Sequence, residues 1–411
     1  MTPEIKRRIE QIRRGEVPEG YKRSTDRIIP NDWYDYQLGD VGEVLMCKRV
    51  YANQTSEVGE IPFYKIGTFG KAADAFISRQ LYEDYRRKYS YPQKGDILIS
   101  AAGTLGKTVI YDGQEAYFQD SNIVWLKTDD RKLSNKYLIH YYQIINWPTP
   151  EGAAIQRLYN GIIRQAHIVA PAVSEQQKIA AILTTQDKVI ELKEKRLAEK
   201  QRQKKYLMQQ LLTGKKRLPG YWREWNFPKA KEVFQSVTDK NHKGDLMVLS
   251  ATQDKGIMPR DEVDIDIKYE VSSLASYKKV CQGNFVISLR SFQGGIEYSA
   301  YTGLVSPAYT VLSPKKELCD EYYKQYFKSA DFINRLNVAV YGIRDGKQIS
   351  FEDFGRLRIP FPPINEQTAI AQVLSTADRE ISLLRQDIEQ EKQKKKALMQ
   401  LLLTGIVRVK I

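Results

Sequence analysis

A segment of 44 residues occurs twice in this chain, and this repeat restricts the possible folds more than any other feature of the sequence. Residues 171–214 read PAVSEQQKIAAILTTQDKVIELKEKRLAEKQRQKKYLMQQLLTG, and residues 362–405 read PPINEQTAIAQVLSTADREISLLRQDIEQEKQKKKALMQLLLTG. The copies align without a gap at an offset of 191 residues, and 19 of the 44 aligned positions are identical. Because internal repeats mark repeated structural units, we expect the same element to be built twice.

Each copy predicts one long helix. Ser174 and Asn365 are candidate N-caps, and Gly214 and Gly405 stand where helices commonly end in a left-handed cap. Between these signals, apolar residues recur every seven positions, which indicates the seam of a coiled coil. The residues predicted to pair the helices are Leu183, Ile190, Leu197, Leu211, Leu374, Ile381, Ile388 and Leu402.

A lysine interrupts the apolar row in each copy, at Lys204 and Lys395, and weakens the predicted seam. A helix with a single apolar stripe still needs a partner, and the matched copy is the obvious one. The alternative is two unrelated amphipathic helices that each pack on their own domain. The gapless repeat over 44 residues argues against that alternative.

The rest of the chain has short aromatic and β-branched runs separated by Gly, Asp and Asn, which is typical of strands and turns. The two halves resemble each other loosely, as Lys94–Ser100 and Gln282–Ser288 show. We therefore expect an α+β protein with this order: an N-terminal helix and linker (1–32), a first domain (33–170), a central helix (171–214), a second domain (215–361) and a C-terminal helix (362–411).

Composition points to a polyanionic partner. The net charge is +14 and the isoelectric point is about 9.3, which favours nucleic acid. A membrane surface is the rival partner, but no apolar run approaches the length of a spanning helix. The basic N-terminus lacks an apolar core, and Cys47, Cys281 and Cys319 are isolated. We expect a cytoplasmic protein with no membrane partner and no zinc site.

The sequence holds no convincing catalytic motif. Ala101–Thr108 (AAGTLGKT) matches a permissive phosphate-loop pattern, but a strand and turn follow it where such a loop requires a helix. We find no adenine-methyltransferase signature, no nuclease cluster of carboxylates and no His/Cys metal set. These observations indicate a binding protein, and we predict no catalytic residue and no metal ligand.

Basic residues interleaved with aromatic and amide side chains are the remaining functional signal. Arg suits bidentate guanine contacts, Gln suits adenine and Lys suits phosphate. The candidate DNA-binding residues are Arg79, Arg86, Arg87, Lys88 and Lys107 in the first half, and Lys278, Lys279, Arg290, Gln293, Arg344 and Lys347 in the second. For each one, a solvated surface charge is the competing interpretation.

The repeated segment resembles the conserved regions of type I restriction–modification specificity subunits. The likeness rests on Pro-x-x-x-Glu-Gln, the following Ile-Ala-x-Ile/Val-Leu, the terminal Leu-Leu-Thr-Gly, the strand Lys94–Ser100, and Trp33 and Trp222 at the domain openings. It covers nearly the whole chain. It implies two target-recognition domains that each read half of a bipartite DNA site, with the repeated helices paired as an antiparallel coiled coil in a pseudo-two-fold arrangement.

The same resemblance implies the partners. Double-stranded DNA and two methyltransferase subunits are expected, with a restriction subunit as an optional further member. S-adenosylmethionine, ATP and Mg²⁺ are expected on those partners, and this chain is expected to bind no cofactor. Two other classes remain as alternatives: a stand-alone site-specific DNA methyltransferase or nuclease, and a structural coiled-coil adaptor.

Overall fold

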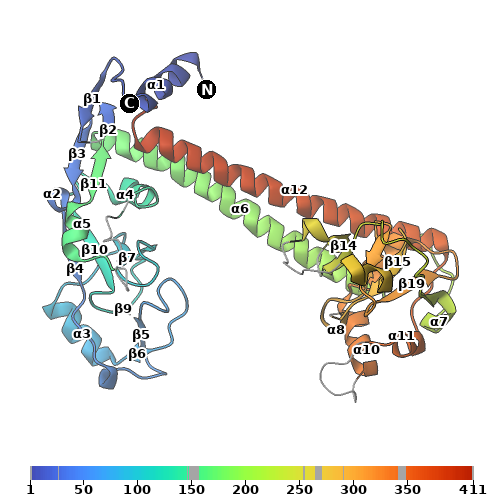
Figure 1. Cartoon of the computed structure of the whole chain (residues 1–411). Coiled ribbons are helices and arrows are strands. Elements are labelled where there is room, and N and C mark those ends of the chain that lie inside the picture. Colours follow the sequence, from blue (N-terminus) through green and yellow to red (C-terminus); the bar gives the residue numbers. More distant parts are fainter. Residues whose placement is uncertain are drawn as a thin grey trace. The chain divides into compact units, whose positions relative to one another are not determined.

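The computed structural model describes residues 2–25, 27–145, 147, 157–252, 255–263, 271–289, 291–340 and 349–409. The chain forms two compact units: unit 1 is Met1–Leu192 with Ile388–Ile411, and unit 2 is Lys193–Asp387. Each unit contains one strand-rich domain and parts of both long helices, α6 (Val173–Leu211) and α12 (Ile364–Leu403), as Figure 1 shows. The predicted α+β class with two long repeated helices is confirmed.

Unit 1 contains, besides its parts of α6 and α12, a series of short elements. They are α1 (Pro3–Arg13), β1 (Tyr21–Ser24), β2 (Arg27–Pro30), β3 (Tyr34–Gln37), α2 (Leu38–Val41), β4 (Gly42–Met46), η1 (Ala52–Gln54), β5 (Ile61–Tyr64), β6 (Phe76–Ile77), α3 (Arg79–Lys88), β7 (Ile97–Ser100), β8 (Thr108–Ile110), β9 (Tyr117–Phe118), β10 (Ile123–Thr128), α4 (Asn135–Tyr141), α5 (Asn160–Gln165) and β11 (His167–Ala170).

Unit 2 has a comparable series. Its elements are α7 (Ala230–Val233), β12 (Phe234–Val237), β13 (Leu249–Thr252), β14 (Gly256–Pro259), η2 (Arg260–Glu262), η3 (Val271–Ser276), β15 (Lys278–Val280), β16 (Phe285–Ile287), α8 (Ser291–Gly294), β17 (Glu297–Tyr298), β18 (Gly303–Val305), β19 (Thr310–Pro314), α9 (Asp320–Tyr326), α10 (Ala330–Val340) and α11 (Phe351–Arg356).

Both domains are built on the same central sheet. The strand order is β4-β10-β7-β8 in unit 1 and β12-β19-β16-β17 in unit 2, with antiparallel neighbours throughout. In each case a short helix, α2 or α7, leads into the first strand, and a helix, α4 or α9, follows the second. The loose sequence likeness between the halves therefore reflects one shared framework.

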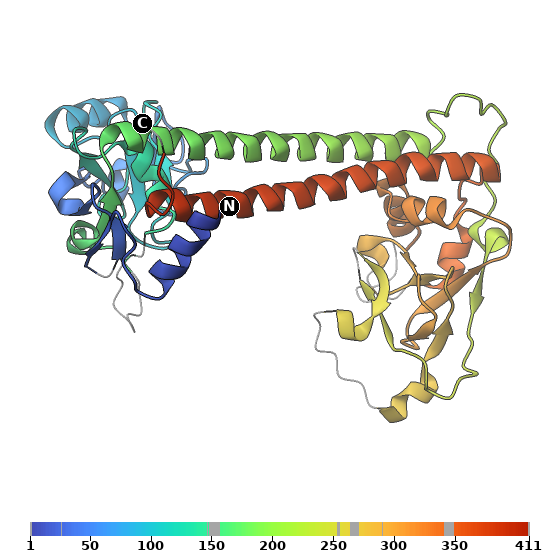
Figure 2. The same ribbon diagram turned by 90° about the horizontal axis from the view of Figure 1, so that it is seen from above.

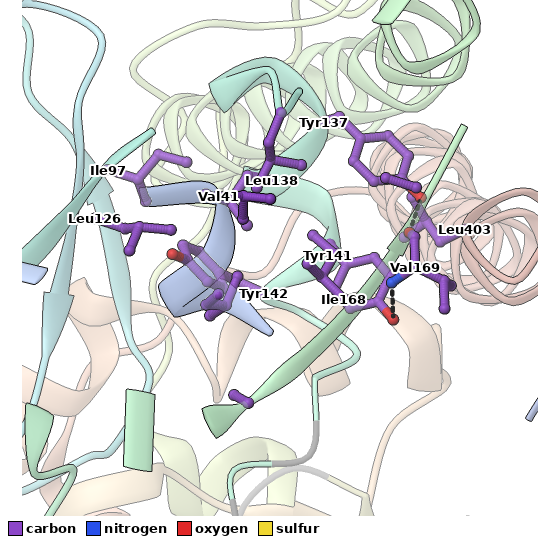
Figure 3. Close-up of a cluster of buried hydrophobic side chains, with 14 of the residues drawn as sticks. Val41, Ile97, Leu126, Tyr137, Leu138, Tyr141, Tyr142, Ile168, Val169 and Leu403 are labelled. Carbon is purple, nitrogen blue, oxygen red and sulfur yellow. Dashed lines mark hydrogen bonds between the residues drawn. The ribbon is translucent and has the colours of Figure 1, made fainter. Parts of the chain in front are cut away.

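The central sheet of each unit separates two cores, because strands such as β7 and β16 are buried on both faces. In β7, Ile97 and Ile99 join an inner core with α4, while Leu98 joins an outer core with Tyr82 of α3. Figure 3 shows the inner core of unit 1, where Tyr137 and Tyr141 lie beside β11 and Leu403. In β16, Phe285 and Ile287 likewise join an inner core of unit 2, while Val286 joins an outer core.

The two long helices run antiparallel within each unit. In unit 1, Gln186 donates a hydrogen bond to Glu391 over 2.6 Å, and Asp187 pairs with Lys395. In unit 2, the ion pairs are Lys193–Asp387, Lys200–Glu380 and Lys204–Asp378, so residue numbers rise on one helix as they fall on the other. Both views show the helices side by side in each unit (Figures 1 and 2).

The heptad residues occupy two kinds of environment. Leu183 and Leu402 enter the inner core of unit 1, and Leu211 and Leu374 enter that of unit 2. Ile190, Ile381 and Ile388 are also buried, whereas Leu197 is half-buried. The helix pair is thus anchored in a domain core at each end of the apolar row.

The Glu-Gln dipeptide of the repeat fixes the start of each long helix to its domain. Gln176 accepts a hydrogen bond from the Ser134 amide at the start of α4 and donates to the carbonyl of Pro171. Gln367 does the same with Cys319 and Pro362. Because the Gln176 and Gln367 side chains are buried, the bonds satisfy polar atoms that would otherwise be costly to bury.

The glutamate of the same dipeptide binds an arginine that follows the opposite long helix. Glu175, which is 1% exposed, pairs with Arg408 at 2.7 Å, and Arg408 also binds Asp32. Glu366, which is fully buried, pairs with Arg217 at 2.6 Å. In unit 1, α1 lies beside the same segment after α12 (Figure 2), where Arg8 donates to the carbonyl of Ile406 over 2.8 Å.

The predicted N-caps were wrong by a short distance. The helices begin at Val173 and Ile364, so Ser174 and Asn365 lie in the first turn. The carbonyls of Ala172 and Pro363 already accept the first helical hydrogen bonds. The buried glutamine side chain instead donates to the carbonyl of the proline that precedes each helix.

The prediction that Trp222 opens the second domain as Trp33 opens the first was also wrong. Trp222 is 82% exposed, whereas Trp33 is fully buried. The counterpart of Trp33 is Trp225, whose ring packs on Gly214 and donates its indole N–H to Glu366 over 2.9 Å. Trp33 lies near Gly405, which adopts φ 75° as Gly214 adopts φ 73°. A side chain at either glycine would meet these neighbours.

Candidate nucleic-acid interface

The candidate DNA-binding residues that the structure describes lie in or beside the outer parts of the two domains. We call the outer lobe of unit 1 the part that carries β5, β6, α3 and β9, and the outer lobe of unit 2 the part that carries β13, β14, β15 and β18. Figure 1 places the first of these at the opposite end of unit 1 from the helices. The outer lobes differ in topology: the first has a three-stranded sheet β6-β5-β9, and the second has the pairs β13-β14 and β15-β18.

Helix α3 presents four of the candidates. The Ser78 hydroxyl caps its first turn, and Tyr82 anchors it in the outer core of unit 1. Arg79 is held in a bidentate pair with Glu115, at 3.1 and 3.2 Å. The Arg86 guanidinium lies over the rings of Tyr82 and Tyr91, 5.8 and 5.3 Å from their centroids. These two arginines are therefore positioned by neighbours before any ligand binds.

The last turn of α3 also carries two cations with exposed side chains. Arg87 and Lys88 pair with Asp84 at 3.5 and 2.6 Å, and their side chains are 77% and 57% exposed. The hydrogen bond from Lys88 lowers the pKa of Asp84. Exposed pairs of this kind contribute little to stability, so a phosphate can replace the carboxylate at little cost.

Lys107 lies in the turn between β7 and β8, which pair as antiparallel strands. The strand-and-turn interpretation of Ala101–Thr108 is thus correct, and no helix follows to form a phosphate loop. The Lys107 ammonium donates to the carbonyl of Phe69 over 2.6 Å. It is therefore tied to the loop after β5.

In unit 2, Lys278 and Lys279 form the start of β15. The Lys278 ammonium donates to the Tyr309 carbonyl over 2.6 Å, and burial together with the charge of Lys240 lowers its pKa. Gln293 lies in α8 and is exposed. The remaining candidates, Arg290, Arg344 and Lys347, lie outside the described residues.

Sequence reasoning missed two basic residues beside α3. The Lys48 ammonium lies 5.1 Å from the ring centroid of Tyr89, and Arg49 pairs with Asp120 at 2.9 Å. Both follow β4, about 30 positions before the start of α3. The only sequence signal was a basic dipeptide at a strand end. The structure brings Lys48 next to the last turn of α3, where it extends the basic surface of Arg86, Arg87 and Lys88.

Two functional classes find no support in the described part of the chain. No group of three or more His, Cys, Asp or Glu side chains there could hold a metal ion. No helix among the described residues is long and apolar enough to cross a membrane.

Comparison with known proteins agrees with this architecture. The model of the type I restriction modification DNA specificity domain matches residues 30–201 and again 223–393. The chain therefore belongs to this family, and its two specificity domains make it a DNA specificity subunit of a type I restriction–modification system. A non-catalytic role in recognition is what this family implies.

Relatives and solved structures extend the likeness. The chain is 58% identical over 147 residues to the Haemophilus influenzae type I specificity subunit S.HindORF215P, a match that spans 36% of this chain and 38% of that protein. It is 24% identical to the Methanocaldococcus jannaschii MjaVIII specificity subunit, over 95% of this chain and 97% of that one.

The S subunit of a type I restriction–modification system from M. genitalium has a similar fold. The structural match covers 93% of this chain and 98% of that one, with a TM-score of 0.53 and 13% sequence identity. A structure that concerns complex assembly in the type I R-M system gives a TM-score of 0.59 at 15% identity, over 92% of this chain and 99% of its own.

Proposed function

We propose that each outer lobe reads one half of a bipartite double-stranded DNA site, and that the two halves differ in sequence. The main observation behind this proposal is the contrast within each unit. The central sheets, the helix anchors and the Glu-Gln contacts repeat, whereas the outer lobes differ in strand topology. A repeated framework suits a common structural task, and the unlike lobes suit two different sequences.

The candidate residues fit a division between positioning and reading. Arg87 and Lys88, with exposed and weakly paired ends, suit phosphate contacts, which supply salt-dependent affinity for any DNA. Arg86, whose guanidinium lies over the rings of Tyr82 and Tyr91, is held in a defined orientation and suits the contacts that distinguish bases. Arg79 would first have to leave its bidentate pair with Glu115. The net charge of +14 supports the same partner.

We further propose that the antiparallel helix pair sets the spacing between the half-sites and docks two methyltransferase subunits, with a restriction subunit as an optional further member. A chain with an internal repeat offers two equivalent surfaces, and these suit two copies of one partner. S-adenosylmethionine, ATP and Mg²⁺ would then be bound by those partner subunits in the cytoplasm. This chain would select the DNA site.

An exchange of one outer lobe tests the proposal. Residues 47–123, which comprise the outer lobe together with β7, β8 and the first residue of β10 of the central sheet, are replaced by the corresponding residues of a related subunit. The methylated sites are mapped by sequencing DNA from cells that also express the methyltransferase. One half-site should change and the other should persist. If both half-sites change in a folded, partner-bound chimera, the lobes do not read independently.

The unmodified chain alone should neither methylate nor cut DNA; turnover that survives stringent purification would favour the stand-alone enzyme.

A further inference from the structure

The outer lobe of unit 1 contains a half-open cavity of about 160 Å³ between the loop after β5 and the loop after β8. Its walls are mainly aromatic and aliphatic: Pro62, Tyr64, Phe69, Val109, Tyr111 and Phe118. The walls are firmly held. The rings of Tyr64 and Phe118 are nearly parallel, with centroids 5.8 Å apart, and Tyr111 meets Phe118 edge-on at 5.6 Å.

Two of the candidate DNA-binding residues each bind a residue that lines this cavity. Lys107 donates to the carbonyl of Phe69, and Arg79 is paired with Glu115; both Phe69 and Glu115 line the cavity. Lys71 lines it as well and is exposed. One cation, Lys71, thus lines an opening with aromatic walls, and two more, Lys107 and Arg79, bind its lining residues. The carboxylates of Asp112 and Glu115 line it as well, and Glu115 is the ion-pair partner of Arg79.

The ligand that matches this combination is flat, aromatic and attached to a negative charge. Aromatic side chains stack on any base, because every base has a π-face, and neighbouring Lys and Arg neutralise the phosphate. A nucleotide has both features. A purely apolar ligand would leave the neighbouring cations unused, and an isolated phosphate would leave the aromatic walls unused.

We propose that this cavity receives a single nucleobase that leaves the stack of the DNA duplex when unit 1 binds its half-site. The inference rests on the proposed function, because it takes the DNA strand as the source of the nucleotide. The same lobe carries Arg86, Arg87 and Lys88 in the last turn of α3, where they would bind the adjoining part of the DNA strand. A base read outside the stack exposes its hydrogen-bonding edge, so the cavity adds a specificity element to the first half-site.

The test uses the full chain and duplexes that contain its own site, as mapped by the methylated positions in cellular DNA. 2-Aminopurine is placed at each position of the first half-site in turn, since its fluorescence rises when it leaves the stack. We expect a several-fold rise at one position. Val109→Phe fills the cavity; it should abolish that rise and weaken binding about tenfold, the scale of one base–aromatic stack. Val58→Phe is the matched control, because Val58 is 86% exposed and does not line the cavity.

Retained binding to the second half-site shows that the Val109→Phe protein is folded. Should that binding be lost, Ile110→Trp replaces it, since Ile110 lines the same opening and is 54% exposed. Stacked bases at every position, with the cavity variant binding as tightly as the Val58→Phe control, would overturn the inference. Binding of AMP that depends on Val109, without any unstacked base in the duplex, would assign the cavity to free nucleotides and overturn the DNA source. If the wild-type chain bound duplexes with and without its site equally tightly, that result would instead contradict the proposed function.

Discussion

The Lys395 ammonium lies 2.6 Å from a carboxylate oxygen of Asp187, and this ion pair joins the two long helices in unit 1. Lys204 and Asp378 form the equivalent pair in unit 2, also at 2.6 Å. Both lysines stand at the same position of the 44-residue repeat, and so do both aspartates. Each lysine that interrupts the heptad row therefore has a defined aspartate partner on the opposite helix. These pairs help to fix the register between the helices.

Lys395→Ala should loosen the helix pair in unit 1. The Lys395 side chain is 15% exposed, so its removal takes from Asp187 the lysine of its ion pair and leaves only the contact with His140 at 3.7 Å. We expect local opening to become easier by about 1–2 kcal/mol. Hydrogen exchange of the amides in 388–403 measures this change. Lys394→Ala is the control, because Lys394 is 62% exposed and 3.5 Å from Glu391. Equal exchange in the two variants would show that the seam pair contributes nothing.

His140 should make the stability of unit 1 depend on pH. This side chain is 3% exposed and lies between Thr184, whose hydroxyl is 3.1 Å away, and Asp187 at 3.7 Å, which also binds Lys395. Burial lowers the pKa of His140, the charge of Lys395 lowers it further, and Asp187 opposes the shift. The neutral form is therefore favoured in the folded state. The contribution of His140 to the free energy of unfolding is therefore fully present above its pKa in the unfolded chain, about 6.5. This contribution is lost as the pH falls through the lower pKa of the folded state.

His140→Gln tests this dependence, because unit 2 has Gln325 at the equivalent position, where it donates to Asp378 over 2.8 Å. The difference in thermal stability between wild type and variant isolates His140, since all other titrating groups are shared. We expect wild type to lose stability relative to the variant between pH 7.5 and pH 5, by about 1.4 kcal/mol per unit of pKa shift. A difference that stays constant over this range would mean that His140 does not titrate differently on folding.

Arg87→Ala should weaken binding to every DNA sequence alike. If Arg87 contacts a phosphate, its loss removes one released counterion, and the salt slope of the logarithm of the binding constant falls by about 1. Arg131→Ala is a suitable control, because Arg131 is 90% exposed, pairs with Asp129 and lies outside the outer lobe. Binding is titrated at several salt concentrations on specific and unrelated duplexes. Identical slopes for both variants would remove Arg87 from the interface, and a change limited to one base position would make it a base contact.

The sequence predicted the scaffold better than the recognition surface, for physical reasons. A repeated heptad is a local pattern, so Leu183 and Leu374 could be assigned to helices without knowing their partners. The pairing of Lys395 with Asp187 joins residues more than 200 positions apart, and no local pattern indicates it. Trp222 and Trp225 have the same residue type, and only burial against Gly214 distinguishes them. The outer lobes repeat least, so the internal comparison offered no guide to where Lys48 meets α3.

The central claim is that the helix pair sets the distance between the half-sites, and insertion of one heptad into each helix tests it most directly. Lys193 pairs with Asp387, so insertions after Lys193 in α6 and after Gln386 in α12 lie opposite each other and keep both apolar rows in phase. At a rise of about 1.5 Å per residue the pair lengthens by about 10 Å, which corresponds to about three base pairs.

The measurement is the spacer length that the double-insertion protein, bound to its methyltransferase, selects from DNA with randomised gaps between the half-sites. We expect the preferred spacer to grow by about three base pairs, with lower affinity because the half-sites also rotate about the DNA axis. A single-sided insertion should bind worse, since the extra turns have no partner. An unchanged spacer in a folded, partner-bound protein would contradict the claim that the helices set the distance.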